Sequence, residues 1–163
     1  MAFVFVGYYK YFHTTFISPI LLLFFMKTGY KVADVMSVKV LTARPSVKLD
    51  ACARLMAKAK VGSLVLLDGR EPVGIVTEQD LARKVLARGV NAKVTSVSKV
   101  MSKKLITISP HDDLYTAMVE MGNHNIKHLL VMQDDKLVGI VSFKDIIKVQ
   151  PALIEVISFK SSA

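Results

Sequence analysis

The sequence repeats itself once in one unbroken register, and no other feature constrains the fold as strongly. The stretch VADVMSVKVLTARPSVKL begins at Val32 and returns as VSKVMSKKLITISPHDDL at Val97, sixty-five residues later. At the same offset, PVGIVTEQDL from Pro72 returns as LVGIVSFKDI from Leu137. Self-similarity at a fixed spacing indicates one supersecondary unit used more than once. We therefore expect two copies of a single small fold.

The first part of each copy predicts an extended piece followed by a helix. The extended pieces, 40–42 and 105–107, run towards a proline, which disfavours helix in the residue before it. In the second copy, Asp112 or Asp113 can cap the helix that follows. Both helices carry apolar residues at i, i+3, i+4 and i+7. These are Leu49, Cys52, Ala53 and Met56 in the first copy, and Leu114, Ala117, Met118 and Met121 in the second.

The second part of each copy predicts a hairpin and a final helix. Two apolar runs flank a polar turn at 68–69, where the residues are Asp-Gly, and again at 134–135. Such a turn between β-rich runs indicates a β-hairpin. The final helices are expected to start near Thr77 and Ser142. The predicted fold class is therefore α/β, with the order β-α-β-β-α occurring twice.

The repeat also predicts the domain organisation. A unit of about sixty residues buries too little surface to be comfortably stable alone, so we expect the two sheets to pack together around a pseudo-twofold axis. Residues 83–96, which contain a glycine and an asparagine, are predicted to link the units. The expected parts are an N-terminal segment (1–31), the first repeat with its linker helix (32–91), the second repeat (92–150) and a C-terminal tail (151–163).

The N-terminal segment differs in composition from the rest. Between Lys10 and Lys27 runs YFHTTFISPILLLFFM, without a formal charge if His13 is neutral. As a helix this run would rise about 24 Å, short of the roughly 30 Å hydrocarbon core of a bilayer. Three interpretations stay open: an extension upstream of a true start at Met26, an apolar arm that packs on the module or a partner, and a membrane anchor.

Charge and cysteine content narrow the function classes. The formal net charge of +9 favours anionic partners such as nucleotides, nucleic acid or a membrane surface. The single cysteine, Cys52, cannot form an internal disulfide, and its place on an apolar helix stripe indicates a core residue. A reducing cytoplasm is the expected compartment.

Each repeat ends with a hydroxyl three residues before a carboxylate. The pairs are Thr77 with Asp80 and Ser142 with Asp145. At a strand-to-helix turn this spacing is typical of a capping box. The same turn can also bind a phosphate at the helix N-terminus, while the carboxylate accepts from ribose hydroxyls. Spacing alone favours the capping role, but its occurrence twice in register favours a binding site.

The ordered set of short motifs resembles the CBS-domain family, named for cystathionine β-synthase, in its paired form. The motifs are DVMS and KVMS, the Thr-x-x-Pro of both repeats, VGSLVLLD and IKHLLVMQDD, and GIVTEQD and GIVSFKD. The resemblance covers roughly 32–148. It implies adenosine-nucleotide binding, usually of AMP, ADP or ATP and sometimes of S-adenosylmethionine, in clefts between the repeats. It also implies a homodimer.

Carried over position by position, the resemblance suggests a set of binding residues. Asp80 and Asp145 correspond to ribose-binding acids, and Thr77 and Ser142 to hydroxyl contacts. The segments that usually line the purine pocket carry Thr42, Thr107, Gly62, Ser63, Lys127 and His128. Lys127 and His128 also stand where the family often places basic residues that face phosphates. The arginine that often precedes the acid is replaced by Gln79 and Lys144, so the first site would borrow Arg83 or a cation from across the cleft.

We therefore expect a cytoplasmic regulatory module, without a catalytic or metal site, that binds an adenine nucleotide and signals occupancy to a partner supplied in trans. Two alternatives stay open. One is a nucleic-acid-binding protein that uses the basic residues around the linker. The other is a structural oligomerisation module whose clefts stay empty. The basic residues are Lys84, Arg88, Lys93, Lys99, Lys103 and Lys104.

Overall fold

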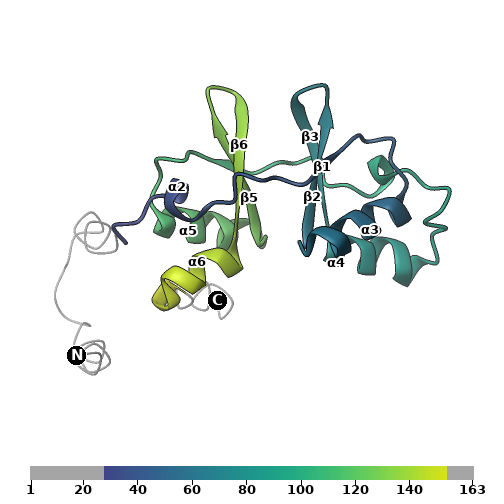
Figure 1. Ribbon diagram of the computed structural model, residues 1–163. Helices are drawn as coiled ribbons and strands as arrows, with labels where there is room; N and C mark the ends of the chain where they lie inside the picture. Colours follow the sequence, from purple (N-terminus) through teal and green to yellow (C-terminus); the bar gives the residue numbers. More distant parts are fainter. Residues whose placement is uncertain (1–27, 154–163) are drawn as a thin grey trace.

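A computed structural model describes residues 28–153 and shows two similar halves side by side, each a small sheet with helices against it (Figure 1). The predicted α/β class with paired repeats is confirmed. The predictions for 1–27 and for the tail beyond 153 lie outside the described residues.

The first half contains β1 (Thr42–Ala43), α3 (Leu49–Ala59), β2 (Ser63–Asp68), β3 (Glu71–Thr77), α4 (Glu78–Asp80), η2 (Leu81–Val85), η3 (Leu86–Arg88) and η4 (Val97–Lys99). The second contains α2 (Val32–Val35), β4 (Thr107–Ile108), α5 (Leu114–His124), β5 (His128–Gln133), β6 (Lys136–Ser142), α6 (Phe143–Val149) and η5 (Pro151–Leu153).

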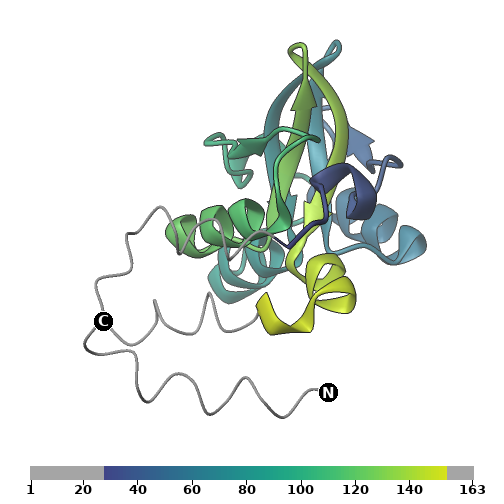
Figure 2. The same cartoon turned by 90° about the vertical axis from the view of Figure 1, so that its left-hand side faces the viewer.

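The two sheets have the same topology and the same register. Their strand orders are β1-β2-β3 and β4-β5-β6, with the first pair parallel and the second antiparallel in each. Thr42 pairs with Val65, and sixty-five residues later Thr107 pairs with Leu130. Strands β3 and β6 make contacts between the halves. Figure 2, turned by 90°, shows the two hairpins overlapping in projection.

The short strands and the first hairpin turn differ slightly from expectation. The parallel strands start at Thr42 and Thr107, two residues later than predicted, because their pairing with Val65 of β2 and Leu130 of β5 begins there. The first hairpin closes over Gly69 and Arg70, since Asp68 already pairs with Glu71. The second closes over 134–135 as predicted, with both aspartates at positive φ, which suits a two-residue hairpin turn.

The long helices bury the predicted stripes. In α3, Leu49, Cys52 and Met56 are fully buried, while Ala53 is half-buried. All four predicted residues of α5 are buried, and the Asp113 carboxylate caps this helix by accepting from the Tyr115 amide at 2.8 Å. These stripes cover one face of each sheet and form two separate cores.

Each half is built from both repeats, which the sequence interpretation did not foresee. Helix α2 precedes the first sheet in the chain, yet Val32 is buried in the core of the second half. Ser37 exchanges backbone hydrogen bonds with Ile140 (2.8 and 3.0 Å), and Ser102 does the same with Ile75 (2.8 and 3.0 Å). Two segments, 36–41 and 101–106, therefore cross between the halves. The first is the dark blue coil that runs from α2 to β1 across the centre of Figure 1.

A methionine and a glycine fix each crossover. A Cβ on Gly74 would lie 2.5 Å from Met101 Sδ, and one on Gly139 would lie 2.7 Å from Met36 Sδ. Real Cβ atoms do not approach so closely, so only glycine accommodates each thioether. The repeated VMS and GIV motifs are thus the two sides of one contact.

Candidate functional site

Two cavities lie at the seam between the halves, at places related by the repeat offset. The first has a volume of 540 Å³ and contains the start of α4; the second has a volume of 590 Å³ and contains the start of α6. Each is completed by the crossover segment that leaves the half of its helix. This segment contributes Ser102, Lys104 and Ile106 to the first cavity and Ser37, Lys39 and Leu41 to the second. Both halves therefore contribute to both cavities.

In the first cavity, both carboxylate oxygens of Asp80 already have partners within the protein. Its Oδ2 accepts from the Thr77 amide at 2.9 Å and from Thr77 Oγ1 at 2.7 Å, while Lys84 Nζ lies 2.6 Å from Oδ1. Burial raises the pKa of Asp80, but the hydrogen bonds from Lys84 and Thr77 outweigh burial and leave the pKa below its usual value. The side chain is only 15% exposed. The capping role is thus real at this position.

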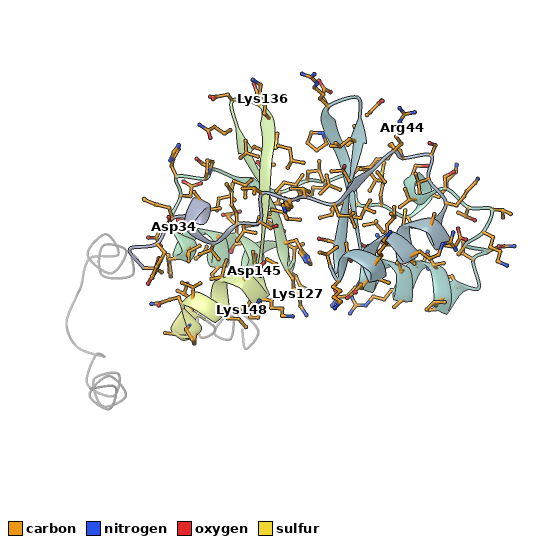
Figure 3. The ribbon with its side chains drawn as sticks, viewed as in Figure 1. Asp34, Arg44, Lys127, Lys136, Asp145 and Lys148 are labelled. Carbon is orange, nitrogen blue, oxygen red and sulfur yellow. The ribbon has the colours of Figure 1, made fainter. Side chains whose placement is uncertain are left out.

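In the second cavity, the equivalent carboxylate has fewer partners. Asp145 accepts from the hydroxyl of Ser142, whose oxygen in turn accepts from the Asp145 amide at 3.3 Å. Lys148 Nζ stays 3.9 Å from Oδ1. The Asp145 side chain is 36% exposed, more than twice the value for Asp80. Figure 3 shows Asp145, Lys148 and Lys127 on the same side of the seam, near the start of α6. This carboxylate is the more available of the two.

Both cavities combine a few acids with more numerous cations. The first is lined by Glu78 and Asp80 and by Arg83, Lys84, Lys104 and Lys127. The second is lined by Glu78 and Asp145 and by Lys39, Lys60, Lys127, Lys144 and Lys148. The excess of cations attracts anions such as phosphate. The carboxylate at the helix start can meanwhile accept from hydroxyl groups, so the arrangement suits a ligand that carries both.

One ionisable side chain lies between the cavities. His128 lines both cavities. Burial lowers the pKa of His128 and Lys127 acts in the same direction, while the charges of Asp145 and Glu78 oppose the shift. The ring is therefore held towards its neutral form.

The structure brings most of the predicted site residues together. Those that line the first cavity are Thr77, Asp80 and Arg83; those that line the second are Ser63, Ser142, Lys144 and Asp145; and those that line both are Gly62, Lys127 and His128. Thr42 and Thr107 line neither and are exposed on β1 and β4. The preceding residues, Leu41 and Ile106, supply the apolar lining instead.

The sequence interpretation missed the polar residues of the crossovers. Ser37 and Lys39 line the second cavity, and Ser102 and Lys104 line the first. The signal was present, because both repeats read Met-Ser-x-Lys at these positions. The sequence interpretation did not include the crossing of these segments to the other half, so it assigned Lys104 to a general basic cluster.

Two further observations concern the described residues as a whole. Among residues 28–153, no helix has the length and hydrophobicity needed to cross a membrane. Within the same part of the chain, no three His, Cys, Asp or Glu side chains gather as metal ligands would.

Sequence relatives carry the same repeats. An uncharacterized protein of Methanopyrus kandleri is 33% identical over 77% of this chain and 65% of its own length. A mitochondrial CBS domain-containing protein of Arabidopsis thaliana is 35% identical over 57% of this chain and 48% of its own. A CBS domain-containing protein of Bacillus subtilis is 32% identical over 71% of this chain and 81% of its own. The chain thus spans less than two thirds of the first two.

Solved structures share the architecture. A putative signal-transduction protein with CBS domains from Burkholderia ambifaria superposes with a TM-score of 0.70 at 30% identity, covering 74% of this chain and 91% of that one. A CBS domain pair in complex with 5′-methylthioadenosine and S-adenosyl-L-methionine superposes with a TM-score of 0.68 at 26% identity, covering 76% and 97%. A hexameric CBS-CP12 protein from bloom-forming cyanobacteria gives 0.69 at 27% identity, covering 77% and 73%.

The profile described as CBS domain matches this chain twice, at residues 32–87 and 97–152. These two ranges contain both hairpins, both helix-start acids and both crossover methionines of the fold described above. The chain belongs to the CBS domain family and carries two copies of that domain.

Proposed function

We propose that this chain is a regulatory module, without catalytic activity of its own, that binds AMP, ADP or ATP in its two seam cavities. The observation that carries the proposal is the placement of Asp80 and Asp145. Each stands at the start of a helix, inside a cavity where cations outnumber acids and both halves contribute residues. S-adenosylmethionine is a further candidate ligand.

The cavity chemistry matches the three parts of a nucleotide. A carboxylate is an acceptor for the two ribose hydroxyls, and lysine and arginine bind phosphate. Leu41 and Ile106 line the cavities with apolar surface against which a purine can pack. Volumes of 540 and 590 Å³ lie within the usual range for small-molecule sites. A solved relative with bound methylthioadenosine and S-adenosyl-L-methionine supports an adenosine-containing ligand.

The crossovers supply a route from ligand binding to regulation. The segments 36–41 and 101–106 connect the halves, and several of their residues also line the cavities. A nucleotide that contacts both halves favours the arrangement of the halves to which it binds more tightly. We infer that a homodimer in the cytoplasm passes this change to a partner protein supplied in trans. The hexameric relative supports assembly in general.

A ligand panel tests the proposal. Thermal unfolding is measured with AMP, ADP, ATP, S-adenosylmethionine, 5′-methylthioadenosine and NAD, and affinities are measured by titration calorimetry. A bound ligand stabilises by mass action, by about 2.7 kcal/mol at one hundred times its Kd. No stabilisation by any adenosine compound at millimolar concentration would leave the structural oligomerisation module as the better account.

Nucleic-acid binding receives less support from the structure. Two of its six proposed cations, Lys84 and Lys104, line the first cavity, and Lys84 is also paired with Asp80. Binding to duplex DNA or RNA that weakens steeply with salt, and that is unaffected by saturating AMP, would favour this alternative.

A further inference from the structure

The two cavities share one wall, and the basic residues of that wall come from only one repeat. Gly62, Glu78, Lys127 and His128 line both cavities. At the repeat offset, Lys127 and His128 occupy the places of Gly62 and Ser63. The backbone is the same at both places, because the Glu78 amide donates to the Gly62 carbonyl at 3.1 Å and the Phe143 amide donates to the Lys127 carbonyl at 2.9 Å. Only the side chains differ.

We propose that the two cavities are anticooperative towards phosphate-bearing ligands, because Lys127 and His128 can bind the phosphate of only one ligand at a time. This inference rests on the proposed function and adds a rule for how the two sites fill. The first nucleotide binds the shared lysine and histidine. The second then meets a wall whose positive charge is already matched.

The surroundings of Lys127 allow it to serve either cavity. Its side chain is exposed, and the ion pairs found among residues 28–153 do not include it. An exposed lysine has a flexible four-carbon stem and can reach an anion on either side. Among the described residues, Lys127 is therefore not paired with a carboxylate before the ligand binds.

The remaining shared charge acts against a second anion. Glu78 has its Oε2 3.3 Å from the position of a Cβ on Gly62, so its carboxylate lies over the glycine of the shared wall. Once Lys127 and His128 face one phosphate, a second phosphate meets Glu78 and the first ligand with only the unshared cations of its own cavity to compensate. Like charges at such separations repel, more strongly in a partly desolvated cleft than in water.

The coupling is measured with single-site variants. Asp80→Ala leaves the second cavity as the main AMP site, and Asp145→Ala leaves the first. For independent cavities, the parent titration is reproduced by the two single-site affinities once the statistical factors for two sites are included. We expect the second step of the parent to be at least about fivefold weaker than the weaker single-site affinity, which is the lower end of typical coupling between sites. Adenosine, which carries no phosphate, is expected to show no such loss.

Three lysine variants and one glycine variant identify the cause. Lys127→Met is expected to weaken the first step and bring the two steps closer together. Lys104→Met and Lys144→Met are matched controls, because each of these lysines lines only one cavity; they should weaken one site and keep the coupling. Gly62→Lys supplies the missing second cation and should also bring the steps together.

The outcomes distinguish a failure of the anticooperativity from a failure of the proposed nucleotide binding. A parent titration reproduced by the two single-site affinities, or coupling that is unchanged in Lys127→Met or equally strong with adenosine, would overturn the anticooperativity alone. Absence of AMP, ADP and ATP binding to the parent would overturn the proposed function, and the coupling with it.

Discussion

Lys84 and Asp80 form a close ion pair, with Nζ 2.6 Å from Oδ1, inside the first cavity. At the repeat offset, the place of Lys84 is taken by Val149, and Asp145 has only the more distant Lys148 at 3.9 Å. A ligand hydroxyl that is to reach Asp80 must therefore displace or share with Lys84. At Asp145 the corresponding oxygen is open. The two cavities are similar in volume but differ in how accessible their carboxylate is to a ligand.

We predict that Asp145→Ala weakens AMP binding more than Asp80→Ala does. Hydrogen bonds to a charged carboxylate are worth about 1.5–3 kcal/mol, so their loss at the second cavity should lower affinity by roughly ten- to a hundredfold. The loss at the first cavity should be smaller, because Asp80 gives up part of its pairing with Lys84 to bind the ligand. Titration calorimetry on both variants gives the two affinities.

The control is Asp68→Ala, which removes an exposed acid at the end of β2, away from both cavities. It should bind AMP as the parent does. If all three variants match the parent, the two helix-start acids only cap their helices and take no part in binding.

The sequence predicted the fold well because two kinds of evidence agreed. Local patterns such as the Leu49 stripe and the turn at 134–135 specified elements, and the sixty-five-residue offset checked each of them a second time. Strand boundaries at Thr42 and Thr107 were less accurate. Such short strands are defined by their pairing partners and carry little pattern of their own.

The site was predicted only in part, for a related reason. Asp80 and Asp145 are local features of a strand-to-helix turn, so spacing identifies them. Ser37 and Lys104 reach the cavities only because their segments cross to the other half. Periodicity describes which face of an element is apolar, but it does not say on which sheet that element packs.

The crossover contacts predict a specific packing defect. Gly74→Ala places a Cβ 2.5 Å from Met101 Sδ and should lower the free energy of unfolding by about 1–3 kcal/mol, as overpacking does. Met101→Ala in the same chain removes the clash, so the double variant should recover part of that loss. Urea unfolding of the parent, both single variants and the double variant completes the cycle.

Gly62→Ala serves as the comparison for this cycle, since its Cβ meets only the flexible end of Glu78, at 3.3 Å. A loss as large as that of Gly74→Ala would mean that glycine is needed for some reason other than the thioether. Additive effects in the double variant would contradict the proposed contact.

We predict that a chain beginning at Met26 unfolds at the same temperature as the full chain, whereas one beginning at Lys39 does not fold stably. The first keeps Thr28, which donates to the Asp113 carboxylate through its amide (3.2 Å) and hydroxyl (2.9 Å). The second loses α2, whose Val32 is fully buried in the second core, and the Ser37 bridge to Ile140.

Circular dichroism melts of the three lengths decide this point. Equal melting of all three would show that α2 adds nothing to the second half. A chain from Met26 that aggregates or melts well below the full one would show that 1–25 belong to the fold, which would exclude the interpretation that Met26 is the true start.

The last prediction concerns His128 and acid. Its pKa is lowered in the folded protein, chiefly by burial, with Lys127 adding to the shift and Asp145 and Glu78 opposing it. The unfolded chain, with a histidine pKa of about 6.5, therefore takes up a proton before the folded chain does. The stability that depends on neutral His128 is present above that value and is lost as pH falls through the lower, folded pKa. We expect the free energy of unfolding to drop between pH 7.5 and 5 in the parent and to drop less in His128→Gln.

His111→Gln, at an exposed position on the loop before α5, is the matched control and should follow the parent. Urea unfolding at both pH values measures the difference, and parallel losses in the parent and His128→Gln would show that His128 is not the group that responds to acid.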